Sequence, residues 1–127
     1  MRIYDGIIVR TRGPLPGKIH DKKFAEYYQI QNDLDPDEWA LGDAGYQGMP
    51  KFIVPFKGEL DDGQRESNKF LGRLRVIVER VYGEIKKFAV FQHPWRGKIP
   101  NQKLLWIIAC NVANIKHRYY PIEINDE

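Results

Sequence analysis

Two acidic residues, Asp43 and Glu79, are of the type and in the kind of position that metal-dependent chemistry needs. Asp43 directly follows a short apolar run, and Glu79 lies within a long helical pattern but outside its apolar stripe. Carboxylate oxygens are the ligands that Mg²⁺ and Mn²⁺ prefer in proteins. Two such ions can activate a water and stabilise the leaving oxygen of a phosphodiester. Because the chain has 17 acidic residues, the spacing of this pair alone does not establish a site.

The segments that must position Asp43 predict two short strands. Residues 38–42, with apolar side chains at 39–41, predict a short buried strand, so that Asp43 stands at its carboxyl end. A second short strand is expected over residues 51–55, with a proline at its exit. A turn rich in glycine connects the two.

The N-terminal part of the chain predicts one more strand pair and one helix. Residues 2–10 are rich in β-forming side chains and are interrupted by Asp5-Gly6, which favours a two-residue hairpin turn. Farther on, Asp21 is expected to cap a helix over residues 22–30.

The second half of the chain is expected to be helical. Apolar residues recur at spacings of three or four from residue 64 to residue 88, which predicts a helix with one core-facing stripe. The members of this stripe are Phe70, Leu74, Ile77, Val81, Ile85 and Phe88. A last helix is expected over residues 101–119, with an apolar side made of Leu104, Leu105, Ile108, Val112 and Ile115. The whole pattern predicts an α/β fold.

Positive charge is concentrated in one region of the sequence. Residues 65–103 carry ten basic residues against three acidic ones, although the whole chain has a formal net charge of only +3. Aromatic residues are interleaved with these cations, and such a stretch can neutralise phosphates and stack on bases. The alternative is an ordinary solvated helix face.

Composition excludes several classes of protein. A chain of 127 residues with 43% hydrophobic and 29% charged residues suits a single domain over residues 1–127. The one cysteine, Cys110, excludes an internal disulfide and a cysteine-based zinc module, and it is expected to be a small buried residue. Neither a membrane-spanning run nor a signal peptide is recognisable, so we expect an intracellular protein that is neither secreted nor membrane-bound.

Three sequence motifs together resemble the C-terminal part of Harbinger-type transposases, which belong to the DDE superfamily of endonucleases. Residues 42–46, GDAGY, resemble the family pattern G-D-x-G-Y around its second catalytic acid. Residues 75–86, RVIVERVYGEIK, resemble its pattern R-x-x-[IV]-E-R-x-[FY]-G-x-[IL]-K around the catalytic Glu. Residues 16–21, PGKIHD, resemble its P-G-S-x-H-D segment. The resemblance extends over nearly the whole chain and keeps the family's order.

The resemblance implies an RNase H-like α/β core with C-terminal helices, in which metal-bound acids cut DNA at transposon ends. Asp43 and Glu79 would be the catalytic acids and the ligands of Mg²⁺ or Mn²⁺. The expected contacts to DNA are Arg75, Arg80, Lys86 and Lys87. In a eukaryote the protein would be nuclear, and otherwise cytoplasmic.

One part of the family pattern has no counterpart in these residues. The family's first catalytic Asp lies in a segment resembling I-D-G-T on an earlier strand, and Asp5-Gly6 resembles instead the turn of the next hairpin. We therefore expect an N-terminally truncated core, from a fragment or a decayed copy, that lacks one metal ligand. Without the first catalytic Asp, the sequence does not decide whether the chain alone is an enzyme. A coding frame that continues upstream of Met1 into a strand with an Asp would restore the full site.

Two alternatives remain beside the nuclease. The first is a non-catalytic, transposase-derived module that binds DNA or protein through its basic face, acting as a homo-oligomer or with an accessory DNA-binding protein. The second is a small globular domain whose resemblance is vestigial, and such a domain would show no salt-dependent binding to DNA.

Overall fold

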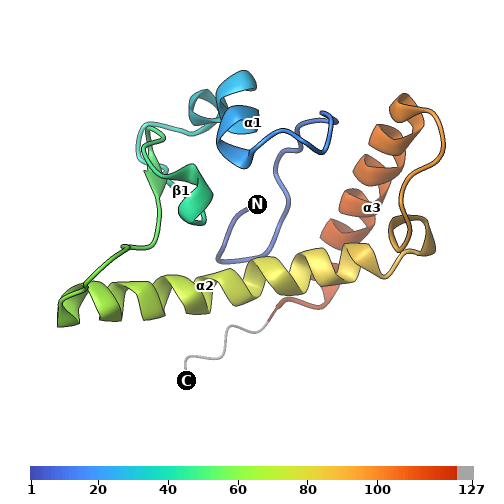
Figure 1. Ribbon diagram of the computed structural model, residues 1–127. Helices are drawn as coiled ribbons and strands as arrows, with labels where there is room; N and C mark the ends of the chain where they lie inside the picture. Colours follow the sequence, from blue (N-terminus) through green and yellow to red (C-terminus); the bar gives the residue numbers. More distant parts are fainter. Residues whose placement is uncertain (123–127) are drawn as a thin grey trace. The chain divides into compact units, whose positions relative to one another are not determined.

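The computed structural model describes residues 1–122 of the chain (Figure 1). Its elements are, in order, α1 (Asp21–Tyr27), η1 (Ile30–Asp33), β1 (Ala40–Leu41), η2 (Ala44–Tyr46), β2 (Phe52–Ile53), α2 (Asp62–Lys86), η3 (Ala89–Phe91) and α3 (Ile99–Tyr119), where η marks a 3₁₀ helix. The fold is therefore mixed α/β, as the sequence predicts. Two compact units divide the chain: unit 1 combines residues 1–14 with those from Arg73 onward, and unit 2 comprises residues 15–72.

In unit 2, the two predicted strands form a small parallel sheet. Ala40 pairs with Phe52 and Leu41 pairs with Ile53. The Gly42 N–H extends the pairing by donating to the Ile53 carbonyl over 2.9 Å. The expectation that the first strand is buried is wrong, because Leu41 is 36% exposed and a sheet of two strands leaves much of each strand open to solvent.

The first helix of unit 2 is shorter than predicted and has a different cap. Asp21 is the first residue of α1 rather than its cap, and His20 occupies the cap position without a side-chain hydrogen bond. The Asp21 carboxylate still lies in the first helical turn, where the helix dipole favours negative charge. The helix ends early because Gln29 adopts a left-handed conformation with φ of 48°.

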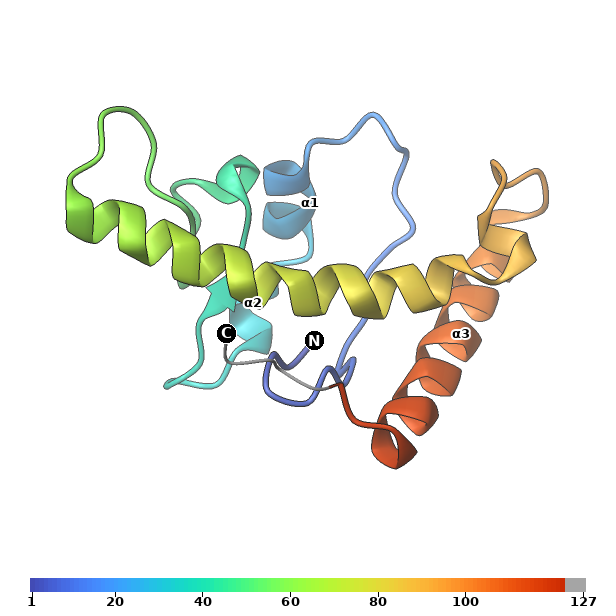
Figure 2. The same cartoon turned by 90° about the horizontal axis from the view of Figure 1, so that it is seen from below.

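The core of unit 1 forms where the C-terminal part of α2 packs on α3 (Figure 2). The predicted long helix is confirmed, and the buried part of its stripe is Ile77, Val81 and Ile85. Phe70 and Phe88 are 56% and 41% exposed, so the two ends of the stripe lie outside the core.

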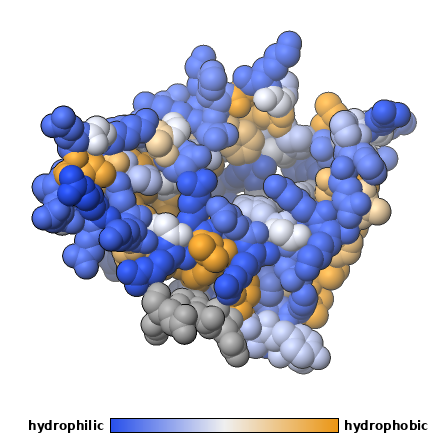
Figure 3. Space-filling model, turned by 60° about the horizontal axis from the view of Figure 1, so that its bottom comes forward, coloured by the Kyte–Doolittle hydropathy of each residue, from blue (hydrophilic) through white to orange (hydrophobic). Residues whose placement is uncertain are grey.

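The apolar side predicted for the last helix does not face the core. The residues of α3 that are buried are instead Ala109, Cys110, Ala113 and His117. Small side chains at a helix contact allow the two helix axes to come close, which explains why this side of α3 packs on α2. Ile108 and Ile115 are 58% and 57% exposed, and Figure 3 shows apolar side chains at the right edge of its view, the side on which α3 lies in Figure 1.

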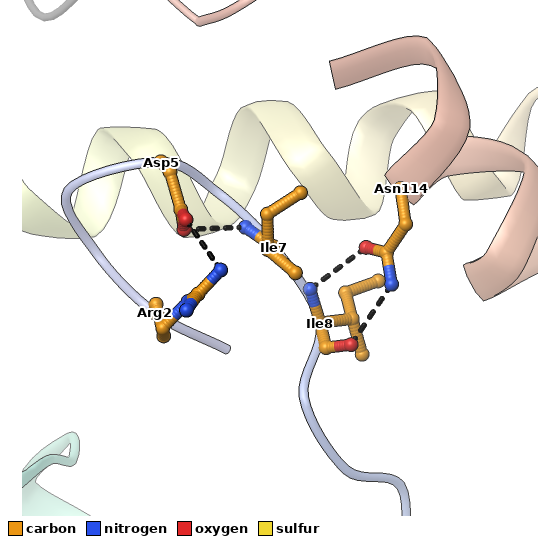
Figure 4. Close-up of polar contacts among 5 residues, drawn as sticks. All are labelled: Arg2, Asp5, Ile7, Ile8 and Asn114. Atoms are coloured by element: carbon orange, nitrogen blue, oxygen red, sulfur yellow. Dashed lines mark hydrogen bonds and ion pairs between the residues drawn. The ribbon is translucent and has the colours of Figure 1, made fainter. Parts of the chain in front are cut away.

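The N-terminal residues form a turn that is held by α3 (Figure 4). The expected hairpin is only partly confirmed: the Arg2 N–H donates to the Ile7 carbonyl and Gly6 has φ of +68°, but no strand lies within residues 1–10. Asn114 replaces a partner strand, since its side-chain amide accepts from the Ile8 N–H at 2.8 Å and donates to the Ile8 carbonyl at 2.9 Å. One side chain therefore satisfies two backbone groups that a β-ladder would otherwise pair.

Across residues 1–122, the helices are too short or too polar to span a lipid bilayer.

Candidate functional site

Asp43 lies at the carboxyl end of β1, as the sequence predicts, and its carboxylate has a fixed direction. The residue is the N-cap of η2, and its Oδ1 accepts a hydrogen bond from the Gly45 N–H at 2.8 Å. This bond uses one oxygen of the carboxylate. The other oxygen, Oδ2, makes no hydrogen bond within residues 1–122 and remains able to bind a cation.

The residues of the GDAGY motif have a packing explanation as well as a chemical one. A Cβ atom on Gly42 would lie 2.9 Å from the Tyr46 ring and 3.0 Å from the Phe52 ring. These two rings stack with centroids 5.1 Å apart and close the loop that carries Asp43. A side chain at position 42 would therefore separate the rings and disturb the loop.

Sequence reasoning missed the proximity of a second carboxylate in unit 2, because it assigned Asp21 a capping role. Asp43 Oδ1 and Asp21 Oδ2 lie 3.0 and 3.9 Å from the position that a Cβ atom would take on Gly45. Both carboxylates thus border the same glycine. The sequence did single out Asp21, which follows His20 in the PGKIHD segment. Nothing in the spacing of the residues, however, predicts that this segment lies beside Gly45.

Glu79 projects from the surface of α2, as the periodicity predicts. Its side chain is 67% exposed, and its Oε1 lies 3.8 Å from Nε of Arg75, one turn earlier. A Cβ atom added at Gly83, one turn later, would meet no atom within 4 Å beyond the adjacent helix backbone. Glu79 therefore stands on an open helix face that a large partner can approach.

The two predicted metal ligands belong to different units, Asp43 to unit 2 and Glu79 to unit 1. Their convergence on one ion stays a prediction. In donor type, both carboxylates fit a hard divalent cation such as Mg²⁺. No cluster of three or more His, Cys, Asp or Glu side chains suited to a metal occurs in residues 1–122. The carboxylate of Asp5 is engaged elsewhere, because it pairs with Arg2 at 2.6 Å and accepts from the Ile7 N–H.

The four cations expected to contact DNA lie on α2 or directly after it. Arg75, Arg80, Lys86 and Lys87 are all exposed. Lys86 follows Glu79 by two helical turns and therefore lies on the same face of the helix. Lys87 follows Arg80 by the same interval, so these two cations share the neighbouring face. A cationic surface thus extends along the part of α2 that carries Glu79.

Two of the cations near this surface share ion pairs with one acid, Glu84. Its Oε1 lies 3.5 Å from Nζ of Lys87, and its Oε2 pairs with Lys116 of α3. The hydrogen bond from Lys116 is the main reason that the pKa of Glu84 is lowered, and the charges of Lys116 and Lys87 add to this effect. Lys87 is therefore a weaker candidate for binding phosphate than Lys86, which forms no ion pair within residues 1–122.

Fold and site together define a mixed α/β protein that carries a directed carboxylate in one unit and a basic, acid-bearing helix in the other. A family model described as DDE superfamily endonuclease matches residues 3–114, a range that includes both Asp43 and Glu79. The chain belongs to this family of endonucleases. The match does not reach the finer level of the Harbinger-type group, which stays a prediction. No curated protein and no solved structure matches the chain.

Proposed function

We propose that this chain is a transposase-type, metal-dependent DNA endonuclease domain of the Harbinger kind, with an RNase H-like core. The observation that carries this proposal is the family match over residues 3–114, a range that contains Asp43 and Glu79. The segments around these two acids resemble the family's motifs for catalytic acids. Asp43 and Glu79 would hold Mg²⁺ or Mn²⁺. DNA is the substrate, and in a eukaryote the protein would act in the nucleus.

The residues of the chain have separate parts in this function. Asp43 would hold the cation with one carboxylate oxygen, because the Gly45 N–H donates to the other. Glu79 supplies a second carboxylate from an exposed helix face. When bound by these acids, a divalent cation would supply activation of the attacking water and stabilisation of the leaving oxygen of a phosphodiester. Arg75, Arg80 and Lys86 neutralise the phosphates on either side of the cleaved bond.

A second function, DNA binding without cleavage, is favoured by one observation. Four cations on α2 or directly after it, Arg75, Arg80, Lys86 and Lys87, are exposed, so a surface that can bind phosphates is present independently of any metal site. In this alternative the basic surface of α2 binds DNA, as a homo-oligomer or beside an accessory DNA-binding protein, and the carboxylates are remnants.

The test is nicking of supercoiled plasmid by the purified chain in Mg²⁺, in Mn²⁺ and in EDTA. Asp43→Ala and Glu79→Ala should abolish nicking. Asp37→Ala and Glu66→Ala are matched controls, because they remove exposed acids outside the proposed site and should leave nicking unchanged. Binding to DNA is measured in parallel as a function of salt.

The outcomes separate the two functions. Metal-dependent nicking that both site variants lose, and both controls keep, supports the endonuclease. Salt-dependent binding without nicking supports the non-catalytic module and contradicts catalysis by the isolated chain. Absence of salt-dependent DNA binding overturns both proposals.

A further inference from the structure

Unit 1 contains a cavity of about 300 Å³ that none of the expected catalytic residues explains. It lies between the loop at residues 11–14, the end of α2 and the first turns of α3. Its lining combines cations, neutral polar groups and aromatic rings: Arg12, Lys86, Lys103, Thr11, Gln102, Phe91 and Trp106. We call it the α3 pocket.

The aromatic wall of the α3 pocket is rigid. Phe91 meets Trp106 edge to face, with ring centroids 5.3 Å apart, and Trp106 stacks on Tyr82 at 6.3 Å. Phe91 and Trp106 also pack against the buried core formed by α2 and α3. Rings held in this way can bind a flat ligand without first losing conformational freedom.

The charge of the lining is entirely positive. Lys86, Lys103 and Arg12 contribute cations, and no carboxylate is among the lining residues. Lys86 and Lys103 form no ion pair within residues 1–122. Holding like charges around one cavity is unfavourable, and an anion placed between them relieves that repulsion. Thr11 and Gln102 add neutral hydrogen-bonding groups beside them.

We infer that the α3 pocket binds a single nucleotide, with its phosphate at Lys86 and Lys103 and its base or sugar against Phe91 and Trp106. A volume of about 300 Å³ is at the small end of ligand pockets, so the cavity accommodates one nucleotide but not a base pair. The nucleotide is thus either an unpaired unit of a DNA strand or a free nucleotide. In taking DNA as the source, the inference rests on the proposed function.

The experiment compares three probes with the full chain: a blunt duplex, the same duplex with a single-stranded thymidine overhang, and free thymidine monophosphate. Lys103→Glu places a negative charge at the pocket, and Gln102→Ala removes an amide without a change of charge. Arg118→Glu is the matched control, because it makes the same charge change at the exposed far end of α3. Thermal unfolding confirms that each variant is folded.

We expect the wild-type chain to bind the overhang duplex about tenfold more tightly than the blunt duplex, as one base gains an aromatic partner. Lys103→Glu should abolish this preference, Gln102→Ala should reduce it, and Arg118→Glu should leave it intact. If Lys103→Glu fails to fold, the overhang preference of Gln102→Ala tests the inference: a reduced preference supports it, and an unchanged preference contradicts it. A third outcome identifies the free nucleotide as the ligand. In it, the wild-type chain shows no preference for the overhang duplex but binds thymidine monophosphate, and Lys103→Glu abolishes that binding.

Failure of this inference is distinguishable from failure of the proposed function. If the wild-type chain binds both duplexes equally and does not bind the mononucleotide, the pocket inference is overturned while DNA binding stands. If the chain binds no DNA, the proposed function fails, and binding of thymidine monophosphate alone tests the pocket inference. Binding that Lys103→Glu abolishes supports the inference, and absence of binding overturns it.

Discussion

Asp43 lies in a loop where a backbone N–H two residues farther on directs its carboxylate, whereas Glu79 stands on a helix surface with Arg75 one turn away. The first arrangement is local, since five consecutive residues and one stacked ring determine it. The second depends on the packing of α2, because nothing next to Glu79 in sequence fixes where the helix lies. The two acids of one predicted site therefore owe their positions to different physical causes, and mutations should affect them separately.

The largest expected effect comes from removing the packing that supports the Glu79 helix. Ile85 is fully buried between α2 and α3, so Ile85→Ala should lower the free energy of unfolding by about 2–5 kcal/mol. Thermal or urea unfolding measures the change. The matched control is Ile108→Ala, which removes the same atoms from a side chain that is 58% exposed and should be nearly neutral. Equal losses in both variants would contradict the core described here.

The next effect concerns the loop that carries Asp43. Gly42→Ala introduces a Cβ atom at 2.9 Å from the Tyr46 ring, and the strain should cost about 1–3 kcal/mol. Hydrogen exchange at the Tyr46 and Met49 amides, which donate within this loop, should become faster. Gly72→Ala is the control: it lies within α2, a new Cβ there meets nothing within 4 Å, and stability should rise by about 0.5–1 kcal/mol.

A smaller effect tests the two acids directly. Asp43→Ala removes the acceptor of the Gly45 N–H and should cost about 0.5–2 kcal/mol of stability, as the loss of other N-caps does. Glu79→Ala removes only an exposed pair with Arg75, which is worth about 0.3–0.5 kcal/mol. Urea unfolding of the two variants at one pH gives the difference. If Glu79→Ala lost more stability than Asp43→Ala, the contrast between a locally held Asp43 and an exposed Glu79 would be contradicted.

Another small effect, comparable in size with that of Glu79→Ala, is a dependence of stability on pH within unit 1. The hydrogen bond from Lys116 lowers the pKa of Glu84, so the folded state favours the charged carboxylate. The resulting stabilisation is present above the ordinary pKa of a glutamate and is lost as the pH falls through the lowered folded value. Glu84→Gln should therefore reduce stability by about 0.5 kcal/mol at neutral pH and by less in acid. Glu66→Gln, on the same helix and exposed, should show no such trend.

Local signals predicted local structure well. The spacing of Ile77, Val81 and Ile85 predicted α2 and its buried stripe, and the apolar runs predicted where both strands lie. These features depend on neighbours in sequence. The length of the strands was not predictable in the same way, because pairing partners rather than propensity decide how far a strand extends.

Tertiary packing explains the features that sequence patterns missed. The periodicity of α3 allowed its large apolar residues to be assigned to the core, yet α2 packs on Ala109 and Ala113, which are small enough for a close helix contact. The proximity of Asp21 and Asp43 arises because α1 lies beside η2, and this contact between segments has no signature in either one. The candidate acids were thus recognisable by motif, whereas their surroundings were not.

The pairing of Asn114 with Ile8 joins residues 106 positions apart in sequence. During translation, Ile8 is made before Asn114, so the turn that contains Ile8 lacks this anchor until α3 has been synthesised through Asn114. Contacts of such long sequence separation slow folding, because a large loop must close before they form. We therefore expect nascent chains that stop short of residue 114 to leave this turn accessible to proteases, and completion of α3 to protect it.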